Sequence, residues 1–176
     1  VVGAGQGQNP ARQATIKAGL PVAVGATTVN KVCGSGLKSV MLAAQAVRLG
    51  DARIVVAGGM ESMSRAPYLL PKARQGYRMG HGELLDSLIQ DGLWDVYGNK
   101  HMGTYGDQCA TKSQLSRQDQ DDFAVRSFTR ARQAQADGAF AAEIVPVPVV
   151  VKKQTTLVKD DEGPARFDEA KLRALR

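Results

Sequence analysis

The cysteine at position 33 stands in a sequence context that suits a nucleophile. Cys33 lies between a short β-branched segment and an apolar segment with helical spacing, and glycines follow it at positions 34 and 36. Glycine lets another backbone or a substrate approach closely. At a helix N-terminus, free N–H groups and the helix dipole favour a thiolate and can stabilise an oxyanion. A lone cysteine is more often a small buried hydrophobe, so both interpretations stand at this point.

Two other motifs near the start of the chain are weaker candidates for chemistry. Ser35 is not part of G-x-S-x-G, because Cys33 occupies the first glycine position, and a serine-hydrolase elbow is therefore excluded. Residues 3–8 look like a dinucleotide fingerprint, but Gln8 stands where the third glycine belongs. The helix would also have to begin before Pro10. A plain loop is the better interpretation of this glycine-rich run.

The elements that must position Cys33 follow the order strand, tight turn, helix. The pattern predicts a strand over 26–32 and a helix over 37–49 that Gly50 ends. The apolar run at 53–57 is typical of a strand buried on both faces of a helix-covered sheet. This order of elements predicts a parallel α/β arrangement.

Caps and breakers predict the remaining elements. Asn9-Pro10 and Gly19 bound a short helix, and Ser116 starts a longer one over 117–137 that Gly138 stops. Phe123, Phe128 and Ala131 are expected on the core side of that long helix. Residues 60–116 lack a βαβ pattern and carry one amphipathic stretch at 82–93. Pro146 and Pro148 place the strand-like segment 143–151 at a sheet edge.

The composition describes a globular chain with no structural metal. Of the 176 residues, 43% are hydrophobic and 23% charged, an ordinary balance for a soluble domain. Two cysteines and two histidines offer neither a disulfide framework nor metal-ligand spacing. Residues 1–59 hold six Lys/Arg against one acidic residue, yet these cations are dispersed and no aromatic stands among them. Nucleic-acid binding is therefore disfavoured, whereas a smaller anionic ligand stays open as an alternative, because a phosphate needs only two or three donors. No apolar run is long enough for a membrane span.

Several motifs, in order along the chain, resemble the thiolase family and in particular its acetyl-CoA acetyltransferase branch. They are VNKVCGSGLKSV around Cys33, AGGMESMS at 57–64, and HMG at 101–103 inside GLWDVYGNKHMGTYGDQ. GQGQNPARQ near the start and LSRQDQDDFAVRSFTRA from residue 115 resemble segments of the same family. The resemblance covers essentially the whole chain.

The resemblance implies an α/β protein with a thiolase-like layered α/β/α fold and an inserted loop domain. Residues 1–59 would form part of the thiolase N-terminal domain, and residues 60–176 the loop domain with its exit segment. The C-terminal thiolase domain is expected to be absent from this chain, together with the family's base and second cysteine. These residues alone are therefore expected to be inactive.

The same resemblance implies roles for four residues. Cys33 matches the nucleophile that accepts the acyl group. His101 and Met102 match a pair that borders the pantetheine and acyl end of bound coenzyme A, and Leu93 matches an apolar residue of that site. A surface histidine is the alternative interpretation of His101. The resemblance implies no metal site.

The implied reaction is reversible transfer of an acetyl group between coenzyme A thioesters, in which two acetyl-CoA give acetoacetyl-CoA and free coenzyme A. One alternative is a 3-ketoacyl-CoA thiolase of fatty-acid β-oxidation, against which the DVYGNKHMG wording favours the short-chain branch. The other is a non-catalytic thiolase-like module that binds coenzyme A or lipid, against which Cys33 in CGSG argues.

The expected partners follow from the same family. The acyl-CoA would be a substrate, with no further cofactor, and the protein would be a homo-oligomer, as a tetramer built from two dimers through a loop at about 69–86. Neither nucleic acid nor a membrane is expected as a partner. The expected compartment is the bacterial cytoplasm or the mitochondrial matrix.

Overall fold

The helices begin and end at the residues that the sequence marks as caps. In the computed structural model, which describes residues 3–175, helix α1 covers Pro10–Lys17. The Asn9 side chain accepts a hydrogen bond from the Arg12 N–H at 3.2 Å, and Gly19 follows the helix with a φ of 78°. The predicted short helix is confirmed, because an Asn cap and a left-handed glycine satisfy its free backbone groups.

Two longer helices also begin and end near the residues that the sequence marks as caps. Helix α2 covers Ser35–Leu49, starting two residues before the predicted position, and Gly50 ends it with a φ of 81°. Helix α4 covers Arg117–Ala136 and begins with a complete capping box between Ser116 and Asp119. Gly138 follows α4 in the left-handed region, as a helix stop requires.

The chain divides into two compact units, Val1–Tyr105 and Gly106–Arg176. The first unit holds α1, α2 and a set of short elements: η1 (Met63–Arg65), β1 (Tyr68–Leu69), β2 (Leu85–Asp86), η2 (Leu88–Leu93), β3 (Trp94–Asp95) and β4 (Lys100–His101). Helix α3 (Met102–Lys112) runs across the division. The second unit holds α4, β5 (Val147–Val151), β6 (Gln154–Val158), α5 (Glu162–Ala165) and α6 (Glu169–Arg173). The domain boundary that the resemblance implies, after residue 59, falls inside the first unit and stays a prediction.

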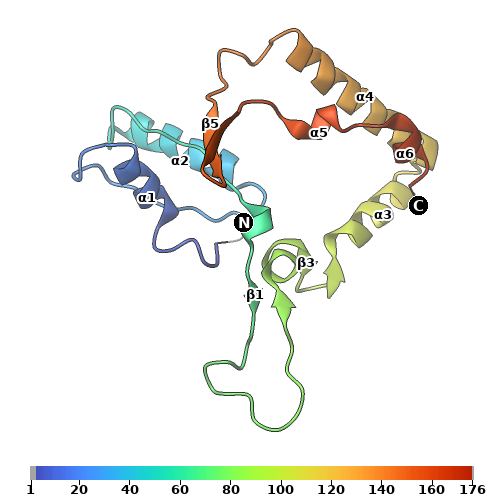
Figure 1. Ribbon diagram of the computed structural model, residues 1–176, viewed down its shortest axis with the longest axis horizontal. Helices are drawn as coiled ribbons and strands as arrows, with labels where there is room; N and C mark the ends of the chain where they lie inside the picture. Colours follow the sequence, from blue (N-terminus) through green and yellow to red (C-terminus); the bar gives the residue numbers. More distant parts are fainter. Residues whose placement is uncertain (1–2, 176) are drawn as a thin grey trace. The chain divides into compact units, whose positions relative to one another are not determined.

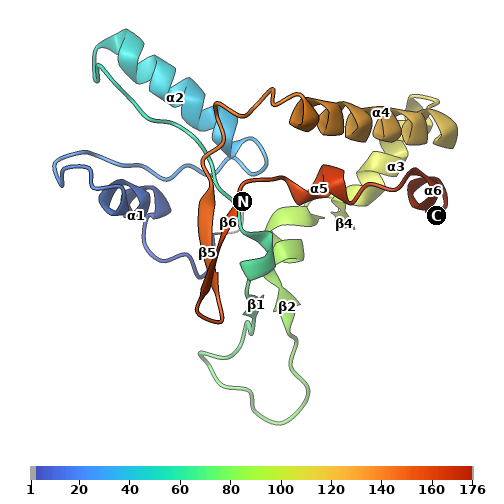
Figure 2. The same ribbon diagram turned by 45° about the horizontal axis from the view of Figure 1, so that its top comes forward.

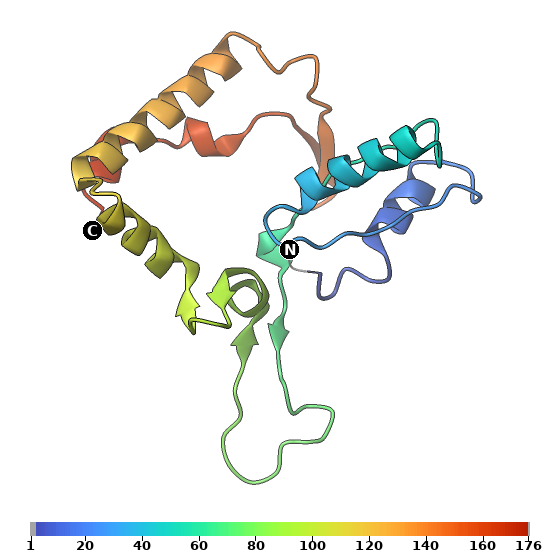
Figure 3. The same ribbon diagram turned by 180° about the vertical axis from the view of Figure 1, so that it is seen from behind.

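Each sheet among the described residues is an antiparallel pair of strands. β1 pairs with β2, and the long loop 70–84 that joins them is drawn in green in Figure 1 and from behind in Figure 3. β3 pairs with β4 through a four-residue turn at 96–99. β5 pairs with β6 through a two-residue turn at Lys152 and Lys153, which Figure 2 shows most clearly.

The prediction of a parallel sheet around Cys33 is wrong for the described residues. Segments 26–32 and 53–57 pair with no other strand there, apart from a single bridge between Lys31 and Cys33. The apolar side chains of Ile54 and Val56 are 87% and 90% exposed. A strand exists only when a neighbour accepts and donates its hydrogen bonds, and residues 3–175 supply no such neighbour. Sequence pattern indicates a preference for strand but cannot provide the partner.

The remaining local predictions hold in part. The amphipathic stretch at 82–93 forms β2 and the π-helical segment η2 rather than one regular helix. Segment 143–151 forms β5 only from Val147, and β5 is an edge strand as its prolines indicate, because its sheet has two strands.

Helix α4 organises the second unit through one aromatic and arginine cluster. Phe128 stacks on Phe167 with 4.7 Å between ring centroids, and the Arg132 guanidinium lies 5.1 Å above the same Phe167 ring. Arg132 Nε donates to the Pro164 carbonyl at 2.7 Å and its terminal nitrogen donates to the Phe167 carbonyl. These contacts hold α5 and α6 along α4, as Figures 1 and 3 show.

The predicted core side of α4 needs one correction. Phe128 and Ala131 are half-buried as expected, whereas Phe123 is 64% exposed, with the Arg126 guanidinium 5.3 Å from its ring centroid. The half-buried stripe follows a different helical register, at positions 121, 124, 125, 128, 131 and 134. Phe123 lies outside that stripe. The prediction failed because residue spacing alone does not determine which face of a helix packs against the rest of the fold.

No helix within residues 3–175 is both long enough and apolar enough to cross a bilayer.

Candidate functional site

Cys33 lies in a tight turn that leads directly into α2. The Gly34 N–H donates to the Lys31 carbonyl and the Ser35 N–H to the Val32 carbonyl, each at 3.1 Å. The Ser35 hydroxyl donates to the Val32 carbonyl at 2.6 Å and accepts the Lys31 N–H at 2.9 Å. The Cys33 thiol is free and exposed, two residues before the first residue of α2. The predicted turn and helix around the cysteine are confirmed, and no part of residues 3–175 buries the thiol.

The residue before Cys33 has an unusual backbone conformation. Val32 has a φ of 49°, in the left-handed region that β-branched residues rarely occupy. Such a conformation costs about 1–3 kcal/mol and persists where the surroundings determine it. Here the Val32 N–H donates to the Asn30 side chain at 3.0 Å, and its carbonyl accepts two bonds from Ser35. The turn that presents the cysteine is therefore tightly specified.

The first turn of α2 is tied to the segment that ends in Gly58-Gly59. The Ser39 hydroxyl contacts the Gly36 carbonyl at 2.7 Å and the Gly58 carbonyl at 2.9 Å. A Cβ added to Gly59 would lie 3.4 Å from the Gly36 Cα, so the two backbones approach closely. Ser39 was not singled out from the sequence. The sequence feature that could have identified Ser39 is a serine one helical turn after a glycine at a helix start. That pattern is too common to single out one residue.

The β3–β4 hairpin brings together the other three predicted site residues. Leu93 ends η2 and is half-buried, Trp94 pairs with His101 across the hairpin, and Met102 begins α3 with 48% of its surface exposed. His101 Nδ1 accepts the Gly103 N–H at 3.0 Å. A neutral imidazole with an accepting Nδ1 carries its proton on Nε2. His101 therefore presents an N–H donor at its exposed edge.

A hydrogen-bonded carboxylate braces the same hairpin. Asp95 Oδ2 accepts the Tyr105 hydroxyl at 2.6 Å and the Gly98 N–H at 2.7 Å. These bonds, the tyrosine's first, hold the pKa of Asp95 below its ordinary value, and the same carboxylate raises the pKa of Tyr105. Neither residue was identified from the sequence, because nothing in their spacing marks them as a pair.

Cys33 belongs to a different element from the hairpin residues. No hydrogen bond or ion pair joins Cys33 to Leu93, His101 or Met102 within the described part of the chain. Residues 3–175 hold no group of three His, Cys, Asp or Glu side chains that could bind a metal ion.

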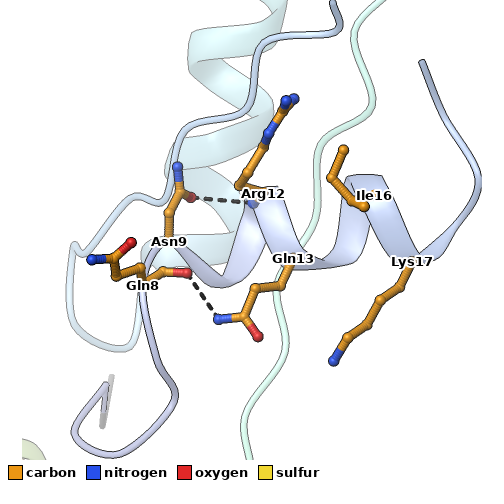
Figure 4. Close-up of a pocket in the computed structure, with 6 residues that line it drawn as sticks. All are labelled: Gln8, Asn9, Arg12, Gln13, Ile16 and Lys17. Atoms are coloured by element: carbon orange, nitrogen blue, oxygen red, sulfur yellow. Dashed lines mark hydrogen bonds between the residues drawn. The ribbon is translucent and has the colours of Figure 1, made fainter. Parts of the chain in front are cut away.

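A surface depression along α1 contains none of the predicted site residues. It is lined along α1 by Gln8, Asn9, Arg12, Gln13, Ile16 and Lys17, as Figure 4 shows. The Arg12 guanidinium already donates to the Val22 and Val24 carbonyls. The depression is a wide-open surface beside a helix, and nothing in it points to chemistry.

The fold and the Cys33 turn together define an α/β protein with an exposed cysteine at the start of a helix. The thiolase N-terminal domain family matches residues 1–176, and the chain belongs to the thiolase family. Its helices and strands superpose on Acat5 thiolase from Ascaris suum, solved in complex with coenzyme A, with a TM-score of 0.90 and 38% identity over the whole of this chain and 44% of that one. The thiolase-like α/β fold is thereby confirmed.

Curated relatives are acetyl-CoA acetyltransferases. Acetyl-CoA acetyltransferase 2 of Arabidopsis thaliana is 54% identical over all of this chain and 44% of its own length. The acetyl-CoA acetyltransferases of Pseudomonas aeruginosa and Cupriavidus necator are 55% and 58% identical over 93% and 87% of this chain, and 42% and 39% of their own lengths. The chain thus spans less than half the length of these relatives.

Proposed function

We propose that this chain supplies the acyl-accepting part of an acetyl-CoA C-acetyltransferase. The observation that carries the proposal is Cys33, an exposed free thiol in a tight turn at the start of α2, in a chain whose curated relatives are named for that activity. The reaction joins two acetyl-CoA into acetoacetyl-CoA and free coenzyme A, in either direction.

The first half-reaction is thioester exchange at Cys33. The Cys33 thiolate attacks the acetyl carbonyl carbon, a sulfur–carbon bond forms, and the bond to the coenzyme A sulfur breaks. Coenzyme A leaves as a thiol with the proton that Cys33 lost, so one thioester replaces another with little change in free energy. N–H groups at a helix start can stabilise the oxyanion of this step, and a Cβ added to Gly36, the second residue of α2, would meet no atom within 4 Å.

The second half-reaction needs groups that lie outside these residues. A base must remove an α-proton from the second acetyl-CoA, and donors must stabilise its enolate, which then attacks the acetyl group on Cys33. Neither exposed histidine stands in hydrogen-bond contact with Cys33 within the described residues. We assign that base to the remainder of a complete thiolase.

The hairpin residues are assigned to the acyl-CoA side of the site. Leu93 and Met102 would contact the apolar pantetheine and acyl groups, and the exposed His101 Nε2–H would donate to an amide or thioester carbonyl. Support comes from their placement in one braced hairpin, and from the coenzyme A complex of the Ascaris suum thiolase.

Assembly and location are part of the same proposal. Loop 70–84 has an exposed Met79, 104% accessible, and a half-exposed Tyr77, which suits a contact between subunits of a tetramer. The chemistry needs no bound cofactor beyond the coenzyme A thioester, since exchange of thioesters requires neither redox nor metal chemistry. We place the reaction in the bacterial cytoplasm or the mitochondrial matrix.

The test uses a full-length thiolase in which residues 1–176 replace the matching segment of the Arabidopsis relative. We expect incubation with acetyl-CoA, acid quenching and digestion to show an added acetyl group on the peptide of Cys33 and none on that of Cys109. Cys33→Ser should abolish both the adduct and turnover, because an alcohol lacks the acidity of a thiol, whereas Cys109→Ser should retain both. Acetylation of Cys109 with Cys33 unmodified would overturn the assignment.

A further inference from the structure

The hydroxyl of Tyr105 ties the first turn of α3 to strand β3. It donates to Asp95 Oδ2 at 2.6 Å, and the two residues are ten positions apart in the sequence. Tyr105 lies three residues after Met102 and four after His101, so it is one helical turn beyond the junction that carries both. Both partners are half-buried. The bond therefore closes the hairpin from the side of the helix.

The same carboxylate closes the turn between β3 and β4. Asp95 Oδ2 accepts the Gly98 N–H at 2.7 Å, and a Cβ added to Gly98 would overlap the Tyr105 hydroxyl. The hydroxyl thus occupies space that only a glycine at position 98 leaves open. A second bond, from Trp94 Nε1 to the Asn99 side chain at 3.1 Å, spans the same turn. Trp94, which pairs with His101, and its neighbour Asp95 are therefore each bonded to the turn between β3 and β4.

We propose that Asp95 and Tyr105 are positioning residues for the acyl-CoA side of the site, acting through His101 and Met102 rather than touching the ligand. This inference rests on the proposed function of that hairpin. His101 pairs with Trp94 in β3, and Met102 begins the helix that Tyr105 anchors. Loss of the tie frees the first turn of α3 to shift along β3, and both ligand-facing side chains move with it.

The protonation states of Asp95 and Tyr105 keep their hydrogen bond intact at neutral pH. The tyrosine hydroxyl lowers the pKa of Asp95, and the carboxylate raises the pKa of Tyr105. At neutral pH the acceptor is therefore ionised and the donor protonated, which is the stronger form of this bond. The tie is not a switch in the physiological range.

Tyr105→Phe removes the hydroxyl alone and is the central test, with Tyr97→Phe as the matched control. Tyr97 lies in the same turn and its side chain is 95% exposed. In the full-length thiolase described above, we expect Tyr105→Phe to raise the KM for acetoacetyl-CoA about threefold to tenfold, as loss of one hydrogen bond allows. The kcat and the extent of Cys33 acetylation at saturating acetyl-CoA should stay unchanged, and Tyr97→Phe should match the unsubstituted enzyme.

Two substitutions of the acceptor provide the rescue comparison. Asp95→Ala should raise KM at least as much as Tyr105→Phe, because it removes both bonds, whereas Asp95→Asn keeps an accepting oxygen and should recover part of the loss. An unchanged KM in Tyr105→Phe, or a fall in kcat at constant KM, would overturn the proposal, since the latter indicates loss of an interaction made only in the transition state.

Titration with free coenzyme A separates this inference from the proposed function. If the unsubstituted enzyme neither acetylates Cys33 nor turns over but binds coenzyme A, the proposed reaction is wrong. A weaker Kd in Tyr105→Phe would then still support the positioning role, and an equal Kd would overturn it. Absence of coenzyme A binding in the unsubstituted enzyme would overturn both.

Discussion

At the scale of single residues, the site consists of a cysteine whose placement supplies the chemistry and a histidine whose placement serves binding. Cys33 follows a valine with a φ of 49° and precedes the first turn of α2. His101 is oriented by one backbone bond from Gly103 to its Nδ1. Substitution of Cys33 should therefore affect acetylation and turnover, whereas substitution of His101 should affect acyl-CoA binding.

His101→Ala is expected to weaken acyl-CoA binding without stopping the first half-reaction. Loss of one donor to a ligand carbonyl should raise the KM of the full-length thiolase about tenfold, as the upper range for a single neutral hydrogen bond allows. Steady-state kinetics with acetoacetyl-CoA measures the change, and His81→Ala, in loop 70–84, is the control. If Cys33 could no longer be acetylated at saturating acetyl-CoA, His101 would have to act as a base for the thiol.

At the scale of elements, the start of α2 depends on a contact far along the sequence. Ser39 bonds to Gly58, nineteen positions away, and Gly36 lies against Gly59. A helix cap alone does not place this turn, because Gly34 at the N-cap makes no side-chain bond. The 53–59 segment therefore helps to hold the cysteine turn.

Ser39→Ala should lower the free energy of unfolding of the full-length thiolase by about 1 kcal/mol, the ordinary net value of one hydrogen bond. Denaturant unfolding measures it, with Ser127→Ala on the surface of α4 as the control. We expect a lowered rate of Cys33 acetylation in the same variant. Unchanged stability and rate would show that the Ser39–Gly58 contact does not support the turn.

The capping box of α4 carries a pH dependence with a definite sign. Hydrogen bonds from the Ser116 hydroxyl and backbone N–H lower the pKa of Asp119. A carboxylate with a depressed folded-state pKa contributes stability that is present above its unfolded pKa of about 3.9 and is lost as pH falls through the folded pKa.

Ser116→Ala should therefore cost about 1 kcal/mol of unfolding free energy at pH 7 and less at pH 3. Urea unfolding of the full-length thiolase at the two pH values is the measurement. Ser113→Ala, just beyond the end of α3, is the control that should show no such pH dependence. An equal loss at both pH values would contradict the role of Asp119 in the box.

At the scale of the whole molecule, the chain exposes much more surface than a folded protein of its size. Its accessible area is 14884 Å² for 18.7 kDa, whereas a compact protein of this mass exposes about 8300 Å², and two separate compact halves about 10000 Å². Among residues 3–175, only Ser87 and Pro164 are buried. The apolar segment 53–57, with Ile54 and Val56 almost fully exposed, needs a covering partner that residues 3–175 do not supply.

Residues 1–176 expressed alone should consequently show no thiolysis of acetoacetyl-CoA. Groups that act as a unit in catalysis are not replaced by the ones that remain, and the exposed apolar segments favour aggregation. We expect binding of a hydrophobic dye and concentration-dependent light scattering from this chain, with the full-length thiolase as the control. Turnover comparable to the control would show that a complete site exists within these residues.

Local features were predictable from the sequence wherever a few neighbouring residues decide them. Asn9-Pro10, Ser116 and Gly50 act through bonds within one helical turn, so the three helices they bound lie where expected. The turn around Cys33 was predictable for the same reason. Phe123 was misplaced because its exposure depends on which face of α4 the rest of the unit covers.

The sequence by itself determined the caps, the cysteine turn and the family motifs, because each depends on residue types at short spacing. Only the tertiary structure revealed the Asp95–Tyr105 tie, the Ser39–Gly58 contact and the unpaired state of 26–32 and 53–57. These features join residues that are distant in sequence, or depend on a neighbouring strand. Hydrogen bonding across such distances is decided by the fold, since each donor in the sequence has many candidate acceptors and the folded chain brings only one of them within about 3 Å.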